Sequence, residues 1–145
     1  MTSPGHASKS QIMDLLRSVP LFAACSKREL SLLAGIADQL EFDSGDVIFR
    51  EGETDVGLQV ILEGQTEVSI GDTARRKLGP GAFLGEIALL DGGPRSATVT
   101  ALTPVKTLSI PAWTFNATLK GEPALALKML RELARRIRES DTPTA

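Results

Sequence analysis

The chain has 145 residues, the length of one domain. Hydrophobic residues make up 42% and charged residues 23%, a balance that is ordinary for a folded protein and argues against disorder. Its 16 Lys and Arg residues against 18 Asp and Glu residues give a net charge of −2. Such a chain lacks the overall basic field that nucleic acid or an anionic membrane would attract.

Single residue types exclude several further classes. Cys25 is the only cysteine and cannot form an internal disulfide. Cys25 and the only histidine, His6, are too few for a zinc site, so we expect no metal. No apolar run approaches the roughly 20 residues that span a bilayer, and residues 1–10 lack the apolar segment of a secretory signal. We therefore expect a cytoplasmic chain with no membrane partner.

The first elements in chain order are helices. Residues 10–17 carry apolar positions at helical spacing, and Pro20 follows them. Ser26 precedes Glu29 by three residues, which is the form of a capping box in front of a second helix.

The middle of the chain predicts strands. Short runs rich in β-branched residues alternate with glycine-containing gaps, a pattern that favours a sandwich or barrel. The predicted strands are 47–49, 58–62, 66–70, 97–100 and 105–110. The basic run 75–77 lies between the predicted strands 66–70 and 97–100, and we interpret it as the solvated flank of a hairpin.

A second strong helix opens near Pro123, a residue tolerated at the first helical position. One face of it is apolar and could be core, a lid or a dimer seam: Leu127, Leu130, Leu133, Ala134 and Ile137. Ahead of it, we expect Trp113 to serve in packing. Residues 1–145 are expected to form one domain, with a core at about 19–140 and flexible ends at 1–9 and 141–145.

The segment 81–98 carries the chemistry. Gly85 allows a close backbone approach or a positive φ, and residues 86–90 are good helix formers. The first N–H groups of a short helix are unpaired and suit an anion. Arg95 offers a planar fork for two phosphate oxygens, whereas the carboxylate of Glu86 would repel phosphate but accept from a sugar hydroxyl. Together they describe a ligand with one anionic end and one hydroxyl end.

This segment closely resembles the phosphate-binding cassette of cyclic nucleotide-binding domains. The residues that carry the resemblance are Phe83-Leu84-Gly85-Glu86-Ile87-Ala88-Leu89 and Pro94-Arg95-Ser96-Ala97. Outside the cassette, the family pattern also fits Phe42, Gly45, Ile48, Gly52, residues 58–64 and residues 78–81. The resemblance covers about residues 19–140. It implies a mainly β fold with helical flanks: an eight-stranded jelly-roll with N-terminal helices, a short cassette helix and a long C-terminal helix.

The resemblance also implies a binding role for seven residues. Glu86 would accept from the ribose 2′-hydroxyl, with the Gly85 backbone close by. The Ala88 N–H and Arg95 would hold the cyclic phosphate, and Ser96 would add its N–H or hydroxyl. Two apolar walls complete the expected site, Ile87 and Val68. The C-terminal helix would supply the lid over the base.

The expected function is a cyclic nucleotide sensor, with cAMP favoured over cGMP, that signals to a protein partner through its C-terminal helix. An adaptor that keeps the fold without binding nucleotide is the alternative, and a structural ion pair between Glu86 and Arg95 would fit it. An enzyme is not expected, because no base–nucleophile pair or metal cluster is visible. We expect no direct DNA binding, since a helix-turn-helix would need more chain after Ser140. A homodimer through the C-terminal helix is compatible with the apolar stripe.

Overall fold

The computed structural model describes residues 7–54 and 57–140. Helices at both ends of the chain enclose a β-rich middle. The helices are α1 (Lys9–Arg17), the short 3₁₀ helix η1 (Pro20–Phe22), α2 (Lys27–Gly35), α3 (Glu86–Asp91), α4 (Ala112–Lys120) and α5 (Pro123–Ser140). The strands are β1 (Asp38–Phe42), β2 (Val47–Phe49), β3 (Leu58–Glu63), β4 (Thr66–Ile70), β5 (Thr73–Leu78), β6 (Phe83–Leu84), β7 (Thr98–Ala101) and β8 (Val105–Ile110).

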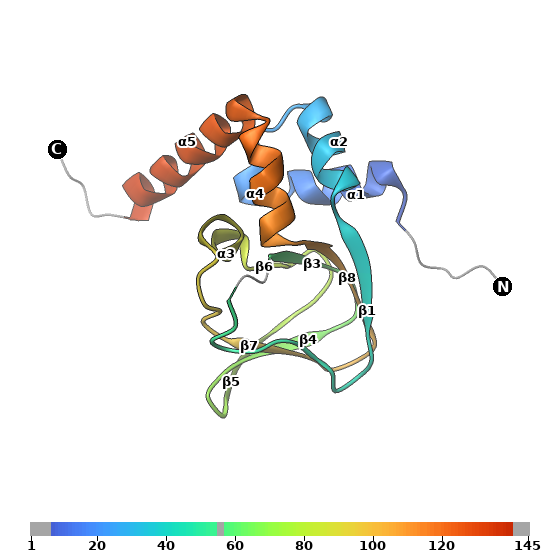
Figure 1. Ribbon diagram of the computed structural model, residues 1–145. Coiled ribbons are helices and arrows are strands. Elements are labelled where there is room, and N and C mark those ends of the chain that lie inside the picture. The colour runs from blue at the N-terminus through green and yellow to red at the C-terminus, as the bar shows by residue number, and fades with distance from the viewer. Residues whose placement is uncertain (1–6, 55–56, 141–145) are drawn as a thin grey trace.

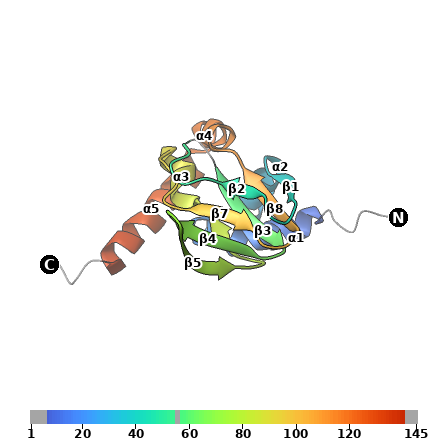
Figure 2. The ribbon, with the colours of Figure 1, turned by 90° about the horizontal axis from the view of Figure 1, so that it is seen from below.

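The strands form two four-stranded antiparallel sheets. One has the order β1-β8-β3-β6 and the other the order β2-β7-β4-β5. Figure 1 shows α1, α2, α4 and α5 gathered at one end of the body that the strands form, while α3 lies at its side. Figure 2 shows the strands of both sheets from the opposite end. The predicted mainly β, eight-stranded jelly-roll with helical flanks is confirmed.

The sheet that contains β3 and β8 separates two hydrophobic clusters. Because side chains alternate along a strand, Leu58 and Val60 of β3 face the helices, whereas Ile61 faces the second sheet. The cluster under the helices includes Phe22 of η1 and Phe115 of α4, whose ring centroids lie 6.0 Å apart. The inner cluster between the sheets consists of Phe49, Ile61, Val68, Leu84 and Val99.

The predicted capping box forms at the start of α2. The Ser26 hydroxyl accepts from the Glu29 N–H at 3.1 Å, and the Glu29 carboxylate accepts from the Ser26 N–H at 2.8 Å. Lys128 of α5 donates to the same carboxylate at 2.6 Å. Leu125 and Met129 are buried beside this contact, so the first half of α5 is fixed on the helical layer.

One alternative left open by the sequence is now decided, and one expectation about an apolar side chain is corrected. Most of the stripe on α5 is not core, since Leu127, Leu130 and Ile137 are 45%, 63% and 63% exposed, and only Leu133 packs partly against the core. The docked face instead carries Leu125 and Met129. The structure also contradicts a packing role for Trp113, which is 76% exposed on α4.

The expected flexible ends lie largely outside the described residues, which exclude 1–6 and 141–145. Of the remainder, Ser8 caps α1 through the Gln11 N–H. Ala7 exchanges two hydrogen bonds with the Gln39 side chain on β1. Leu16 of α1 is fully buried in the cluster under the helices, ahead of residue 19 where the predicted core begins.

Candidate functional site

The backbone around α3 depends on two glycines. Gly85 has a φ of +82° and precedes the helix, and Gly92 has a φ of +65° and ends it. Both values lie in the left-handed region, which disfavours residues with a Cβ atom. The Gly85 carbonyl accepts from the Leu89 N–H at 3.0 Å, so the turn of the chain from β6 into α3 is set at this residue.

A cavity of about 400 Å³ opens between α3, the loop after it and the sheet β2-β7-β4-β5. This volume is in the usual range for small-molecule sites. All seven residues expected at the site line it: Val68, Gly85, Glu86, Ile87, Ala88, Arg95 and Ser96. The structure therefore brings the predicted site residues together, and their binding roles stay predictions.

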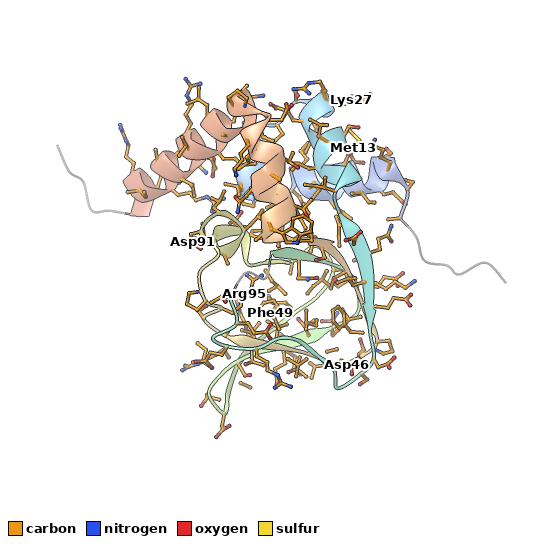
Figure 3. The ribbon with its side chains drawn as sticks, viewed as in Figure 1. Met13, Lys27, Asp46, Phe49, Asp91 and Arg95 are labelled. Atoms are coloured by element: carbon orange, nitrogen blue, oxygen red, sulfur yellow. The ribbon has the colours of Figure 1, made fainter. Side chains whose placement is uncertain are left out.

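Arg95 is the buried cation of this cavity. Only 5% of it is exposed, and its guanidinium carbon lies 4.4 Å from the ring centroid of Phe49. Figure 3 shows the Arg95 side chain beside Phe49, inside the strands and below α3. The same guanidinium donates to the Gly57 carbonyl and lies where a Cβ atom on Gly85 would be. A glycine at position 85 is therefore needed for space as well as for its φ.

The charge on Arg95 persists despite its surroundings. Burial lowers the pKa of its guanidinium, and the carboxylate of Glu53 opposes that change. Because an arginine normally titrates above pH 12, the group stays protonated at pH 7. Backbone hydrogen bonds of 2.9 Å from the Arg95 N–H to Glu53 and from the Gly52 N–H to Arg95 fix its position. A buried, fixed cation at the wall of a cavity is suited to hold an anion.

Glu86 begins α3 and contacts two other helices. Its carboxylate accepts from Arg136 of α5 at 2.7 Å and 3.1 Å, and from the Leu21 N–H of η1 at 3.3 Å. Glu132, one turn earlier on α5, also accepts from Arg136, at 2.9 Å. The hydrogen bond to Glu86 is the main cause that raises the pKa of Arg136. The ion pair that the structure shows for Glu86 is thus made with α5.

The expected lid does not cover the cavity in this structure. None of the described residues of α5 lines it, and α5 reaches the site only through Arg136 and its pair with Glu86. In Figure 1 the second half of α5 runs outward from the strands, past α3.

Sequence reasoning missed three residues of this region. Phe49 and Arg136 gave no signal, because each meets its partner across about 40 to 50 residues of chain. Arg76 lines the cavity, although the run 75–77 was interpreted as a solvated flank. That interpretation holds for the strand as a whole, since β5 is exposed. The alternation with Leu78, two residues later, was an available signal that Arg76 faces inward.

Two features are absent from the part of the chain that the structure describes. No group of three or more His, Cys, Asp or Glu side chains comes together in a way that could hold a metal ion. In the same part of the chain, no helix has both the length and the apolar character needed to cross a membrane.

Known proteins are similar to this chain in sequence and in fold. The family model of the cyclic nucleotide-binding domain matches residues 39–122. A cyclic nucleotide-gated potassium channel of Mesorhizobium japonicum is 36% identical over 113 residues, which are 78% of this chain and 31% of the channel. A CRP-like cAMP-activated global transcriptional regulator of Mycobacterium tuberculosis is 29% identical over 137 residues, which are 91% of this chain and 61% of the regulator.

A solved structure supports the same assignment. The N-terminal domain of a transcriptional regulator from Streptomyces coelicolor superposes with a TM-score of 0.82 at 33% identity, covering 91% of this chain and 98% of that one. The chain spans less than two thirds of the length of both full-length relatives described above. The family model covers more than half of the chain, and the matched part contains the whole cavity wall from Phe49 to Val99. The chain therefore belongs to the cyclic nucleotide-binding domain family.

Proposed function

We propose that the chain is a sensor that binds a cyclic nucleotide in this cavity, with cAMP favoured over cGMP. The observation that carries the proposal is the buried guanidinium of Arg95, held at the cavity wall beside Gly85. In this assignment the cyclic phosphate pairs with Arg95 and with the N–H groups of Ala88 and Ser96. The ribose 2′-hydroxyl donates to Glu86.

The proposal includes a mechanism for transmitting the binding event. Glu86 alone would repel the phosphate, because both are anions. Arg136 neutralises that carboxylate, so docking of α5 favours the ligand. Coupling free energies are reciprocal, and the ligand must therefore favour docking of α5 to the same extent. Movement of the second half of α5 toward the cavity is the rearrangement that a partner would sense.

The exposed stripe on α5 is the proposed contact surface. Leu127, Leu130 and Ile137 expose apolar side chains, and movement of the second half of α5 changes the position of Ile137 relative to the other two. A protein partner or a second copy of the chain that docks there would bind differently to the two states of α5. The sensor has no catalytic step in this proposal, and turnover of a cyclic phosphodiester would contradict it. We place it in the cytoplasm.

Isothermal titration calorimetry with cAMP and cGMP tests the proposal. Truncation of a buried charge that pairs with a ligand costs about 3 to 5 kcal/mol, so Arg95→Ala should weaken binding by a factor of a hundred or more. Arg95→Lys keeps the charge and loses the planar fork, and should bind at an intermediate level. Arg50→Ala removes an exposed arginine that is not among the residues lining the cavity, and serves as the matched control.

The outcomes separate the sensor from the adaptor. Micromolar binding that Arg95→Ala abolishes and Arg50→Ala preserves supports the sensor. Absence of heat with either nucleotide, on folded protein freed of co-purified ligand, would favour an adaptor. A melting curve of each variant shows that it is folded.

A further inference from the structure

The exposed stripe of α5 has the spacing of a coiled-coil seam. Leu127, Leu130, Ala134 and Ile137 follow one another at intervals of three, four and three residues. In a heptad written abcdefg, this spacing makes Leu127 and Ala134 a residues and Leu130 and Ile137 d residues. All four side chains are exposed. These are the positions that a helix buries against a second helix packed alongside it, so α5 presents a seam for one.

The seam lies on a different side of α5 from the contacts with the rest of the chain. Leu125 and Met129 are buried in the cluster under the helices, and Arg136 pairs with Glu86. Figures 1 and 2 both show α5 projecting from the body that the strands form. From the first to the last residue of the seam, the helix rises by about 15 Å. A second helix can therefore lie along the seam while α5 keeps its present contacts.

The flanks of the seam carry positive charge and no negative charge. The e positions, which border a seam on one side, are Arg131 and Arg138, and both are exposed. None of the ion pairs that α5 makes within the described residues involves either of them. The g positions on the other side are Ala126 and Leu133, which carry no charge. A helix that packs on the seam therefore meets two arginines without a counter-charge.

A second copy of α5 is a poor occupant of this seam. In a parallel pair, a residues face each other and e residues face g residues. The Ala134 residues of two copies would then leave a gap between the Leu130 and Ile137 layers. The arginines would face only Ala126 and Leu133. In an antiparallel pair e residues face each other, so arginine would repel arginine.

A helix of different sequence removes both defects. A large apolar residue opposite Ala134 fills the gap that two alanines would leave. Glutamates beside Arg131 and Arg138 supply the missing counter-charges, as e and g residues do in specific coiled coils. The surface therefore fits a helix that is apolar along one side and acidic along the edges of that side.

We propose that the exposed seam of α5 binds an acidic amphipathic helix of another protein. The inference deepens the proposed function, because it states the chemistry of the partner that α5 would contact. It rests on that function only in taking α5 as the element that signals. The seam itself is present in the structure without any ligand, so binding of the helix can be measured with and without nucleotide.

Two designed helical peptides of three heptads serve as probes, both with Leu at a and d. One has Glu at every e and g position and the other has Lys there, so like charges keep each peptide from pairing with itself. Fluorescence anisotropy of the labelled peptides should show binding of the acidic peptide and weaker binding of the basic one. Reversing two exposed charge pairs changes an affinity by about tenfold. The double variant Arg131→Glu/Arg138→Glu should therefore weaken binding of the acidic peptide by about this factor and strengthen binding of the basic one.

Matched controls separate the seam from general charge and from general apolar surface. Arg50→Glu/Arg75→Glu makes the same change in net charge at two exposed arginines outside α5 and should preserve the preference for the acidic peptide. Leu130→Gln should weaken binding of that peptide, whereas Leu32→Gln, at an exposed leucine of α2, should not. Melting curves show that each variant is folded.

The outcomes decide the occupant of the seam. Binding of the acidic peptide that depends on Leu130, Arg131 and Arg138 supports the inference, even if the chain gives no heat with a nucleotide and the proposed function fails. Equal binding of both peptides, or no binding of either, would overturn it. Sedimentation of the chain alone should show a monomer. A dimer that Leu130→Gln dissociates would make a second copy the occupant and would also overturn the inference.

Discussion

Replacing Arg136 by Met should weaken cyclic nucleotide binding although Arg136 does not line the cavity. The variant keeps most of the apolar stem of the side chain and removes the cation that donates to Glu86 at 2.7 Å and 3.1 Å. The side chain of Glu86 is 11% exposed and that of Arg136 is 25% exposed, so solvent screens this pair only in part. The variant would leave an anion at the wall of an anion site.

The size of the effect follows from the charges. Two like charges about 8 Å apart repel by about 2 kcal/mol at an effective dielectric constant of about 20. Arg136 offsets that repulsion between Glu86 and the bound phosphate. Since 1.4 kcal/mol is a factor of ten, the dissociation constant should rise by about ten- to thirtyfold. Because the coupling between nucleotide binding and docking of α5 is reciprocal, removal of Arg136 should also remove the effect of the ligand on docking of α5.

Two measurements check this expectation, calorimetric titration and amide hydrogen exchange along residues 130–140. In the unmodified chain, ligand should slow exchange in this part of α5, and in Arg136→Met it should not. A 2′-deoxy nucleotide keeps the phosphate charge and should still slow the exchange in the unmodified chain, although it cannot donate to Glu86. Arg138→Met is the matched control, because Arg138 is exposed on the same helix and forms no ion pair with the residues that the structure describes. Equal affinities of the two variants would refute the role of Arg136.

Three further predictions concern stability and reactivity. Gly85→Ala should lower the melting temperature and abolish binding, because its Cβ atom would occupy the place of the Arg95 guanidinium at a φ of +82°; unchanged melting would contradict the close approach. Hydrogen bonds from Arg135 and Arg136 lower the pKa of Glu132 to about 2, below the value of about 4.3 in an unfolded chain. The ion pairs of Glu132 therefore add to the free energy of unfolding above about pH 4.3, and this contribution is lost as the pH falls through about 2. In urea unfolding, Glu132→Gln should be less stable than the unmodified chain at pH 7. The two should be about equally stable near pH 2. Burial is the larger cause that raises the pKa of Cys25 to about 11, and the charge of Glu29 is the second. Iodoacetamide at pH 8 should therefore label this thiol only after unfolding. Rapid labelling of the folded chain would refute the burial of Cys25.

Local signals in the sequence predicted the elements that local chemistry determines. The capping box of Ser26 and Glu29 forms with both of its expected hydrogen bonds, and Pro123 is the first residue of α5. The cassette also depends on short-range features, because Gly85 sets the turn and the helix follows at once. These features need no knowledge of distant residues.

Features that depend on distant partners were not predictable in the same way. Helical periodicity shows that α5 has apolar residues at regular spacing, but it cannot show which of two apolar faces docks. The docked face is the one that carries Lys128, which pairs with the buried Glu29 of α2. Leu125 and Met129 are buried on the same side of α5. The pair of Arg136 with Glu86 likewise joins residues that are 50 positions apart. The expectation that Trp113 serves in packing is wrong because it rests on the size and apolar character of one side chain. A single residue does not show which face of α4 it lies on.

Glu86 is the residue at which the site and the helices meet. A carboxylate offers about four lone-pair positions. Arg136 and the Leu21 N–H together supply three hydrogen bonds to it, so one position is left for a ribose hydroxyl. A ligand can therefore bond to Glu86 without displacing η1 or α5. Because all partners can be held at once, the expected response to ligand is a tighter association of η1, α3 and α5, and not the release of α5 from the site.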